Sequence, residues 1–344
     1  MLARTEPESL AVSVICLDPE RSVRVTALDI TSPIVALWAP GLFSSRGRRG
    51  RTLARLAARG RYAPVAAGPA ERALFRLFLM DDDRLPFAAV THAADAGGVD
   101  DAAWLRVDPV HLALGPQQAF LTDPETLLLS QAEARDLGAL LIPVFKPYGY
   151  GLEILHPARW YVRLGASDRI CTTPLYQALG HDVGPIMPTG VERNLWHRLL
   201  TEAQMVLYEA PVNQRREAEG RPVVNSVWPW GEGRIPRTPA IWSSVRADDI
   251  LIRGLAQVTG CALQPSPASV ADVLAAGPVG RHLMALSGPL DPEIFDEQWL
   301  TPLYSALRSS NLPALALVDG SAVLTIDTRE ARRWWRFGGF HGHD

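Results

Sequence analysis

The sequence predicts a two-part α/β protein. A chain of 344 residues is longer than one small domain, and about two domains are usual at this length. Short β-branched runs and amphipathic helical patterns follow one another in the first part of the chain. A loop rich in Asp and Gly, residues 95–101, then precedes a part of different character, and we place a domain boundary there.

The first part contains three β-branched, apolar runs that predict strands, at residues 12–17, 23–28 and 34–38. A helix is expected over residues 51–59, with Gly60 after it in the left-handed conformation that glycine adopts at low cost. A second helix fits residues 70–80, because apolar side chains recur on one face. Residues 87–91 predict another strand.

The middle of the chain begins with a capping-box pattern, Ser130 and Glu133, which predicts a helix from there to about Leu141. Strands are expected at 151–155 and 160–164, and helices at 191–208 and 212–219. The segment 228–239 is dense in Trp, Gly and Pro, so we expect no long regular element there.

The last part predicts a helix over residues 248–258 and strands over 282–286 and 314–318. The C-terminal tail carries two tryptophans and two phenylalanines, which are Trp334, Trp335, Phe337 and Phe340. Four aromatic side chains so close together are costly to leave in water, so we expect the tail to dock on its own core or on a protein partner.

Composition excludes several classes of function. The net charge of −3 gives no electrostatic footprint for nucleic acid, and the arginines between Arg46 and Arg61 are interpreted as a solvated helix face with a basic loop. No apolar run is long enough to predict a membrane span, and no export signal is visible. Three scattered cysteines argue against a disulfide framework and a cysteine zinc site. These features predict a cytoplasmic protein.

One motif is specific. Asn213 and Arg216 are followed by the unbroken stretch NSVWPWGEGRIP, residues 225–236. This pattern resembles the archaeal-type cofactor-independent phosphoglycerate mutases, whose pattern is roughly H-P-V-N-x-x-R, then G-x-x-x-x-N-x-I-W-L-W-G-x-G-x-x-P. The likeness covers about residues 100–260. The combination of this motif with the stretch 104–111 (WLRVDPVH) also resembles a narrower bacterial family. Its members are labelled RpfE-type or phosphoglycerate mutase-like, and the chain is identified as a member of it.

The resemblance implies the alkaline phosphatase superfamily: an α/β core sheet with an inserted α+β domain that holds the phosphosugar. It implies a discontinuous core of residues 1–98 plus 240–344, with residues 99–239 as the insert. It also implies two divalent cations held by Asp and His residues, because phosphoryl transfer depends on charge neutralisation around the phosphate.

The residues that would hold these cations are largely absent. No Asp-Gly pair follows the strands between Val12 and Pro40, and Thr52, near the position of the family's nucleophile, has no neighbouring carboxylate in sequence. The stretch 286–293 stands where the family has its Asp-x-x-Gly-His-x-Gly-Asp cluster, and it contains no histidine. We therefore expect no catalytic residues, no bound metal and no cofactor. The His-Gly-His-Asp end, residues 341–344, is interpreted as an unstructured tail.

Eight residues form the candidate binding site: Arg106, Asp108, His111, Asn213, Arg216, Asn225, Trp228 and Trp230. We expect two groups, 106–111 and 213–225, to meet across a cleft, with either Arg106 or Arg216 internally paired and the other free for a phosphorylated or carboxylated ligand. For Asn213, Arg216 and Asn225, the alternative is that they only brace the Trp-rich loop by hydrogen bonding to its backbone. We expect Trp228 and Trp230 to face opposite sides, one in the core and one lining the cleft.

The leading functional hypothesis is a degenerate mutase-like protein with a non-catalytic binding or regulatory role. The alternative is an active phosphotransferase or phosphohydrolase of the same type. A nucleic-acid binder is the third class, and the overall charge argues against it.

Overall fold

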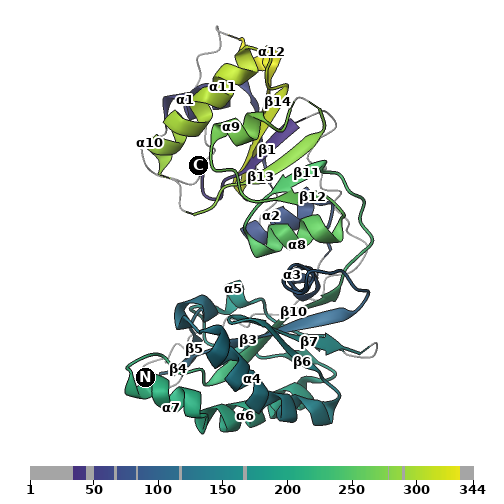
Figure 1. Cartoon of the computed structure of the whole chain (residues 1–344), viewed down its shortest axis with the longest axis vertical. Coiled ribbons are helices and arrows are strands. Elements are labelled where there is room, and N and C mark those ends of the chain that lie inside the picture. The colour runs from purple at the N-terminus through teal and green to yellow at the C-terminus, as the bar shows by residue number, and fades with distance from the viewer. Residues whose placement is uncertain are drawn as a thin grey trace, which may run out of the picture.

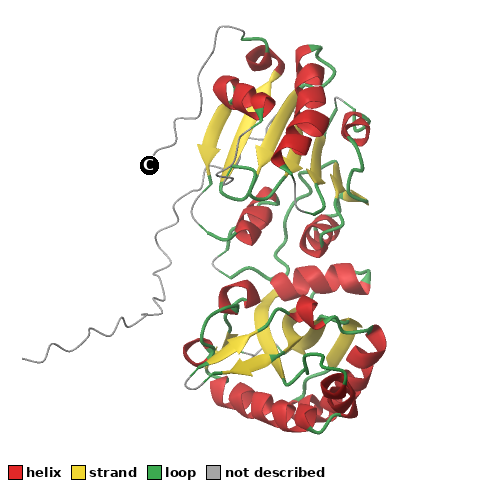
Figure 2. Ribbon diagram, turned by 90° about the vertical axis from the view of Figure 1, so that its left-hand side faces the viewer, coloured by secondary structure: helices red, strands yellow, loops and turns green. Residues whose placement is uncertain are grey.

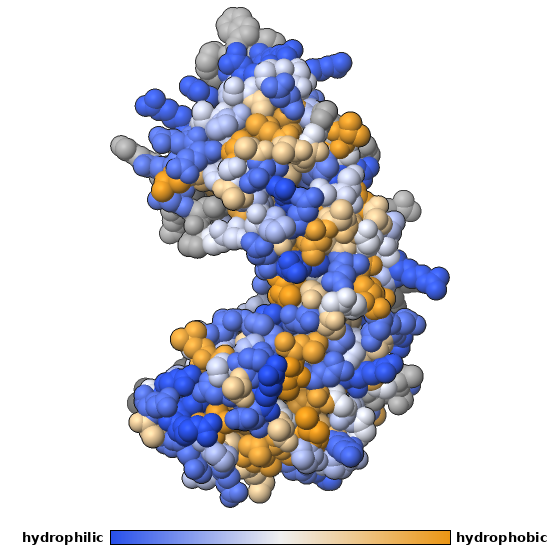
Figure 3. All heavy atoms as spheres, viewed as in Figure 1, coloured by the Kyte–Doolittle hydropathy of each residue, from blue (hydrophilic) through white to orange (hydrophobic). Residues whose placement is uncertain are grey.

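The computed structural model describes residues 34–43, 50–65, 68–82, 84–115, 118–165, 169–277, 279–288 and 291–333. These residues form two lobes joined by a narrower waist (Figures 1 and 3). The strands expected at 12–17 and 23–28, the arginines 46–49 and the tail from Trp334 lie outside the described residues. Within the described part, no helix has the length and apolar character needed to cross a membrane.

One lobe is built on a sheet that we call the large sheet. In the described residues its strand order is β12 (Ala262–Gln264), β11 (Ser244–Arg246), β13 (Arg281–Ala285), β1 (Ile34–Trp38), β14 (Ala314–Val318), β15 (Ala322–Asp327) and β2 (Arg61–Pro64). The strands from β12 to β14 are parallel, and β15 and β2 are antiparallel. Because β1 pairs with both β13 and β14, residues 34–38 share a sheet with strands that lie more than 240 positions later in the chain.

Helices cover both faces of the large sheet (Figure 2). Alternate side chains of the buried strand β1 feed two cores: Val35 and Leu37 enter one, and Ala36 and Trp38 the other. The first core is closed by α1 (Arg51–Arg59), α9 (Val270–Leu274), α10 (Pro292–Phe295), the π-helical turn Asp296–Leu300, α11 (Thr301–Arg308) and α12 (Thr328–Ala331). The second is closed by α2 (Ala70–Leu77), α3 (Phe87–Ala96) and α8 (Ile250–Val258).

The other lobe is built on the small sheet. Its described strands are antiparallel and lie in the order β10 (Ser226–Arg234), β3 (Ala103–Val110), β7 (Arg159–Leu164) and β6 (Leu152–His156). One face packs on α4 (Gln131–Phe145), α6 (Arg193–Tyr208) and α7 (Pro211–Ala218). Short elements complete the lobe: β4 (Leu112–Leu114), β5 (Ala119–Leu121), β8 (Ile170–Cys171), β9 (Thr189–Gly190), α5 (Leu175–Ala178) and 3-10 turns at Pro124–Leu127, Lys146–Tyr148 and Gly184–Ile186.

Helix α3 lies between the two lobes (Figure 1). All its residues from Phe87 to Ala93 are buried, because α3 packs on α8 of the large-sheet lobe and on β10 of the small sheet. Two glycines permit these close approaches. A Cβ on Gly254 of α8 would lie 2.2 Å from the Val90 carbonyl oxygen, and one on Gly231 of β10 would lie 2.8 Å from the Phe87 Cβ. The glycines of the Trp-Gly motif and the following helix therefore position the lobes.

Most of the predicted elements in the described residues are confirmed within a few residues. The capping box of α4 is formed by Ser130 and Glu133, and α4 continues past Leu141 to Phe145. The strands expected at 151–155 and 160–164 are β6 and β7. The helices expected at 51–59, 191–208, 212–219 and 248–258 are α1, α6, α7 and α8.

Three expectations are wrong. Residues 87–91 form the start of α3 rather than a strand, because a short apolar run that is buried on all sides has the same pattern in both structures. The helix expected over 70–80 ends at Leu77, because Leu79 takes a left-handed conformation. Gly60 is extended, with φ −81°, because the chain enters β2 directly after α1.

The Trp-rich segment is also more regular than expected. It forms the edge strand β10, in which a register shift between Trp230 and Gly233 absorbs the glycines. Pro229 is compatible with an edge strand, since its missing N–H costs no ladder bond on the open side.

We propose that the two lobes correspond to the two domains expected from sequence, a core of 1–98 plus 240–344 and an insert of 99–239. The large sheet takes its described strands from residues 34–64 and 244–327, and the small sheet takes its strands from 103–164 and 226–234.

Candidate functional site

The carboxyl edge of the parallel strands in the large sheet is where ligands bind in open α/β sheets. Strand β1 is followed at this edge by Ala39, Pro40 and Gly41, none of which carries a carboxylate. Asp319 follows β14, Asp248 follows β11, and the loop 286–288 follows β13. Helix α1, which carries Thr52 in its first turn, packs on one face of this sheet.

The N-terminus of α1 is occupied by a carboxylate of the chain itself. Asp296 accepts the backbone N–H of Thr52 at 3.0 Å through one oxygen and that of Leu53 at 2.8 Å through the other. Helix N-termini attract anions because their N–H groups have no partner within the helix and carry the positive end of the dipole. The position that a phosphate would take at this helix is therefore filled by Asp296, which is itself buried.

The hydroxyl of Thr52 is engaged as well. It lies 2.7 Å from the hydroxyl of Thr301, which donates to the Asp296 carbonyl oxygen at 2.9 Å. Because Thr301 uses its hydrogen on that carbonyl, Thr52 is the donor between the two hydroxyls. No carboxylate accepts a proton from Thr52 in this arrangement of described residues.

Asp319 is bound equally tightly to its own surroundings. One carboxylate oxygen accepts the backbone N–H groups of Ser321 and Ala322 and the Ser321 hydroxyl, and the other accepts the N–H of Phe43 at 2.9 Å. Asp248 lies in an exposed group, where it accepts the Ser266 backbone N–H and the Ser287 hydroxyl. Hydrogen bonds from Ser266 lower the pKa of the Asp248 carboxyl.

These carboxylates do not fit as ligands of the two cations that the resemblance implies. A divalent ion needs carboxylate or imidazole lone pairs directed at one point, and those of Asp296 and Asp319 are directed at backbone N–H groups. In the described part of the chain, no group of three His, Cys, Asp or Glu side chains is arranged to hold a metal ion.

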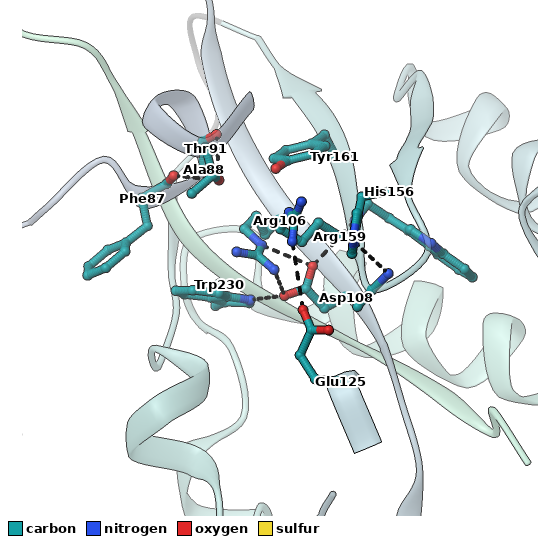
Figure 4. A network of polar contacts seen from close by, with 12 residues as sticks. Phe87, Ala88, Thr91, Arg106, Asp108, Glu125, His156, Arg159, Tyr161 and Trp230 are labelled. Carbon is teal, nitrogen blue, oxygen red and sulfur yellow. Dashed lines mark hydrogen bonds and ion pairs between the residues drawn. The ribbon is translucent and has the colours of Figure 1, made fainter. Parts of the chain in front are cut away.

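Arg106, Asp108 and Trp230 form one buried unit on the face of the small sheet toward α3 (Figure 4). The Arg106 guanidinium binds both Asp108 oxygens, at 3.0 and 2.7 Å, and stacks over the Trp230 ring. The Trp230 indole N–H donates to Asp108 at 2.7 Å. Burial raises the pKa of the Asp108 carboxyl, while Arg106 and Trp230 act in the opposite direction. Because every contact with this carboxyl comes from a donor, we describe it as ionised.

Three predicted residues connect β10 to its neighbours. Asn225 accepts the Leu112 N–H at 2.7 Å and donates to the Leu112 carbonyl at 2.9 Å. His111 lies 2.9 Å from the Val223 carbonyl oxygen through Nδ1, which therefore carries the hydrogen. Trp228 donates from its indole N–H to the Thr173 carbonyl at 3.0 Å. Each of these contacts braces the Trp-rich strand.

Asn213 and Arg216 brace the other side of the small sheet. Asn213 donates to the Leu207 and Val224 carbonyls and accepts the Val224 N–H. Arg216 is fully buried, and its guanidinium binds the Glu133 carboxylate at 3.0 Å as well as two backbone carbonyls, those of Pro222 and Leu127.

The expected cleft is therefore wrong in two respects. First, Arg106 and Arg216 are both internally paired, so neither is free in the way that we expected. Second, Arg106 and Asp108 lie on the face of the small sheet opposite to α7, which carries Asn213 and Arg216, and only residues 111–112 and 223–225 of the two groups are hydrogen-bonded to each other. Arg106 and Asp108 alternate along β3 with Leu105 and Val107, which enter the same core as Val212 of α7.

The two tryptophans also differ from expectation. Trp228 and Trp230 are separated by two positions, so an extended strand directs them to the same face. Both are buried in the core of the α3 side, at 3% and 6% exposure.

Sequence reasoning missed the residues that complete these groups. Asp95 of α3 binds Arg159 at 2.8 Å and the Tyr161 hydroxyl at 2.6 Å, and thereby ties α3 to β7. For Asp296 the sequence shows only that Gly50, at the N-cap of α1, has no capping side chain, which does not point to a particular partner. Glu232, within the motif, accepts the Thr172 N–H, and burial raises the pKa of its carboxyl.

Comparison with known proteins gives partial matches. No protein-family model matches the chain. It is 29% identical over 159 residues to a probable 2,3-bisphosphoglycerate-independent phosphoglycerate mutase of Geobacter sulfurreducens, a match that covers 45% of this chain and 38% of the relative. It is 26% identical over 174 residues to the 2,3-bisphosphoglycerate-independent phosphoglycerate mutase of Methanothrix thermoacetophila, covering 42% and 44%. The matches thus span less than half the length of these curated relatives.

A protein of Pyrococcus horikoshii has a similar structure. The TM-score is 0.50 at 14% identity, over 87% of this chain and 92% of that chain. The mixed α/β architecture with a central sheet, predicted from sequence, is confirmed by this likeness and by the fold itself. The predicted similarity to cofactor-independent phosphoglycerate mutases is confirmed, because both curated relatives are named 2,3-bisphosphoglycerate-independent phosphoglycerate mutases.

Proposed function

We propose that this chain is a degenerate relative of the cofactor-independent phosphoglycerate mutases with a non-catalytic binding or regulatory role. The observation that carries the proposal is the contact between Asp296 and the N-terminus of α1. A phosphoryl group at this helix would have to displace a buried carboxylate of the chain and would meet its negative charge.

The engaged hydroxyl of Thr52 supports the same proposal. A nucleophile needs a nearby base or cation to take up or replace its proton, and Thr52 donates instead to another hydroxyl. The narrower RpfE-type assignment, the cytoplasmic location and a protein partner for the C-terminal tail stay predictions from the sequence.

The active phosphotransferase remains the second candidate, because the curated relatives are named as mutases. One assay separates the two candidates. The purified protein is incubated with 3-phosphoglycerate, with and without added Mn²⁺, and formation of 2-phosphoglycerate is measured.

We expect no interconversion above background under either condition. Because a trace of host mutase could produce a signal, Thr52→Val is assayed in parallel. Turnover that a chelator abolishes and that Thr52→Val removes would establish the active phosphotransferase and refute our proposal.

A further inference from the structure

A cavity of about 330 Å³ lies against one face of the large sheet. It is lined by residues of β11, β12, β13 and the end of α9, which are Ser244, Arg246, Gln264, Ala275, Ala276 and His282. Its volume is within the range of small-molecule sites. Polar side chains line one wall, and the small side chains of Ala275 and Ala276 line another. The cavity therefore leaves space for a ligand next to Arg246.

The polar wall follows from the register of the strands. Ser244 pairs with His282, and Arg246 pairs with Gln264, so these side chains project from the same face of adjacent strands. The Ser244 hydroxyl lies 2.7 Å from Nδ1 of His282, and Nε2 of His282 lies 2.9 Å from the Val279 carbonyl. Because a carbonyl only accepts, Nε2 carries the hydrogen, and in the neutral ring Ser244 donates to Nδ1. This chain of hydrogen bonds fixes the wall.

Arg246 is the cation of the cavity. Its Nε donates to Gln264 at 2.8 Å and its Nη1 to the Asp272 carbonyl at 3.3 Å, and no hydrogen bond within the described residues engages Nη2. The Asp272 carboxylate stands 3.7 Å from Nη1, but its other oxygen caps α9 by accepting the N–H groups of Ala268 and Ser269. The charge of Arg246 is thus only partly compensated, and its side chain retains 24% exposure.

We propose that this cavity binds a compact oxyanion, a phosphate or carboxylate group of a small molecule, with Arg246 as the principal ligand. The planar guanidinium suits both groups, because its parallel N–H bonds match their oxygen spacing. Gln264, which also lines the cavity, holds the guanidinium through its hydrogen bond from Nε and leaves Nη2 for the anion. The inference gives the proposed binding role a location and in that respect rests on the proposed function.

The test is isothermal titration calorimetry of the full chain with inorganic phosphate and, separately, with acetate, against chloride at equal ionic strength. We expect saturable binding of at least one of the two oxyanions. Phosphate alone would assign the site to phosphoesters, acetate alone to carboxylates, and both to oxyanions generally.

Arg246→Gln should weaken the binding about tenfold or more, since it removes a charge-assisted contact. Arg253→Gln is the matched control, because Arg253 lies on α8 at the other face of the sheet. Ala275→Leu, at an exposed lining position, should also weaken binding by filling the space, without disturbing the core. The proposal fails if neither oxyanion saturates, or if Arg246→Gln and Arg253→Gln bind alike. Mutase turnover would refute the proposed function without affecting these results.

Discussion

At the residue scale, the two predicted arginines of the small lobe are neutralised by carboxylates of the same chain. Arg106 pairs with Asp108 inside the sheet, and Arg216 pairs with Glu133 at the start of α4. Replacing such a pair by apolar residues can be neutral, whereas removing one partner leaves the other charge buried and alone. The net contribution of such a pair to stability is therefore small compared with the cost of removing one partner.

Arg106→Met should lower the free energy of unfolding by about 3–5 kcal/mol, because it leaves the fully buried Asp108 carboxylate without its cation. The double variant with Asp108→Leu should lose less than the sum of the single variants. Urea unfolding measures both. Arg163→Met, at an exposed position of the neighbouring strand β7, is the control and should be nearly neutral. Additive losses in the double variant would contradict the pairing.

Glu133 should make stability depend on pH. Burial alone would raise the pKa of its carboxyl, but the Ser130 backbone N–H and the guanidinium groups of Arg216 and Arg221 outweigh burial and lower it from 4.5 to about 2. A depressed carboxyl pKa stabilises the fold above the unfolded pKa, so this contribution is present above pH 4.5 and is lost as the pH falls toward 2. At about 1.4 kcal/mol per pKa unit the full shift would correspond to about 3 kcal/mol, and solvent screening of this partly exposed carboxylate reduces the contribution below that value.

The measurement compares wild type with Glu133→Gln by chemical unfolding at pH 7 and at successively lower pH. The difference between them should shrink as the pH falls below 4.5. Asp136→Asn, an exposed position on the same helix, should follow wild type at every pH. A difference that stays constant down to pH 3 would show that Glu133 titrates normally.

The sequence located the residues of these groups but could not give their partners. Arg216 and Glu133 are 83 positions apart, and Glu133 was predicted only as a helix cap. A polar residue near a Trp-rich motif has the same one-dimensional pattern whether it binds a ligand or a carbonyl of its own chain. The bracing alternative accounts for the hydrogen bonds that Asn213 and Asn225 make, because each uses its amide on backbone groups.

At the element scale, α1 depends on a cap that comes from 244 positions away in the chain. Asp296→Ala should lower the free energy of unfolding by about 1–2 kcal/mol, since it leaves the Thr52 and Leu53 N–H groups without a partner. Asp291→Ala is the matched control, because Asp291 caps the short helix α10 from an exposed position. Its loss should be smaller. If thermal unfolding shows that both variants lose the same stability, Asp296 stabilises α1 no more than an ordinary exposed cap would.

Elements were predictable where one face is exposed and ambiguous where burial is complete. The amphipathic helices α1 and α6 and the strand β6, whose burial alternates, can be recognised from the period of their side chains. Helix α3 cannot, because both lobes cover it and every residue from Phe87 to Ala93 is buried, so no exposed face marks the helical period. The bulge that lets β10 continue through two glycines requires knowledge of the partner strand.

At the scale of the whole molecule, the two lobes share one helix. Of the described residues, those from Phe87 to Ala93 are buried between α8 and the small sheet, and Asp95 adds a link to β7. The contact allows no side chain at Gly254. Unfolding of one lobe would expose the apolar surface of α3, so the lobes should lose structure together.

Gly254→Ala should separate the unfolding of the two lobes. The added Cβ would lie 2.2 Å from the Val90 carbonyl oxygen and 2.8 Å from its Cγ1, so α8 and α3 must move apart. Alanine is favoured over glycine within a helix by about 1 kcal/mol, so any loss of stability has to come from the contact with α3. Overpacking of this kind costs about 1–3 kcal/mol. Urea unfolding followed by far-ultraviolet circular dichroism and by tryptophan fluorescence should coincide in wild type, and the two curves should part in the variant. Gly98→Ala is the control, since no atom lies within 4 Å of its added Cβ, and it should keep one coincident transition. If Gly254→Ala also keeps a single transition at the wild-type midpoint, α3 does not couple the unfolding of the two lobes. The close contact with α3 would then not require glycine at position 254.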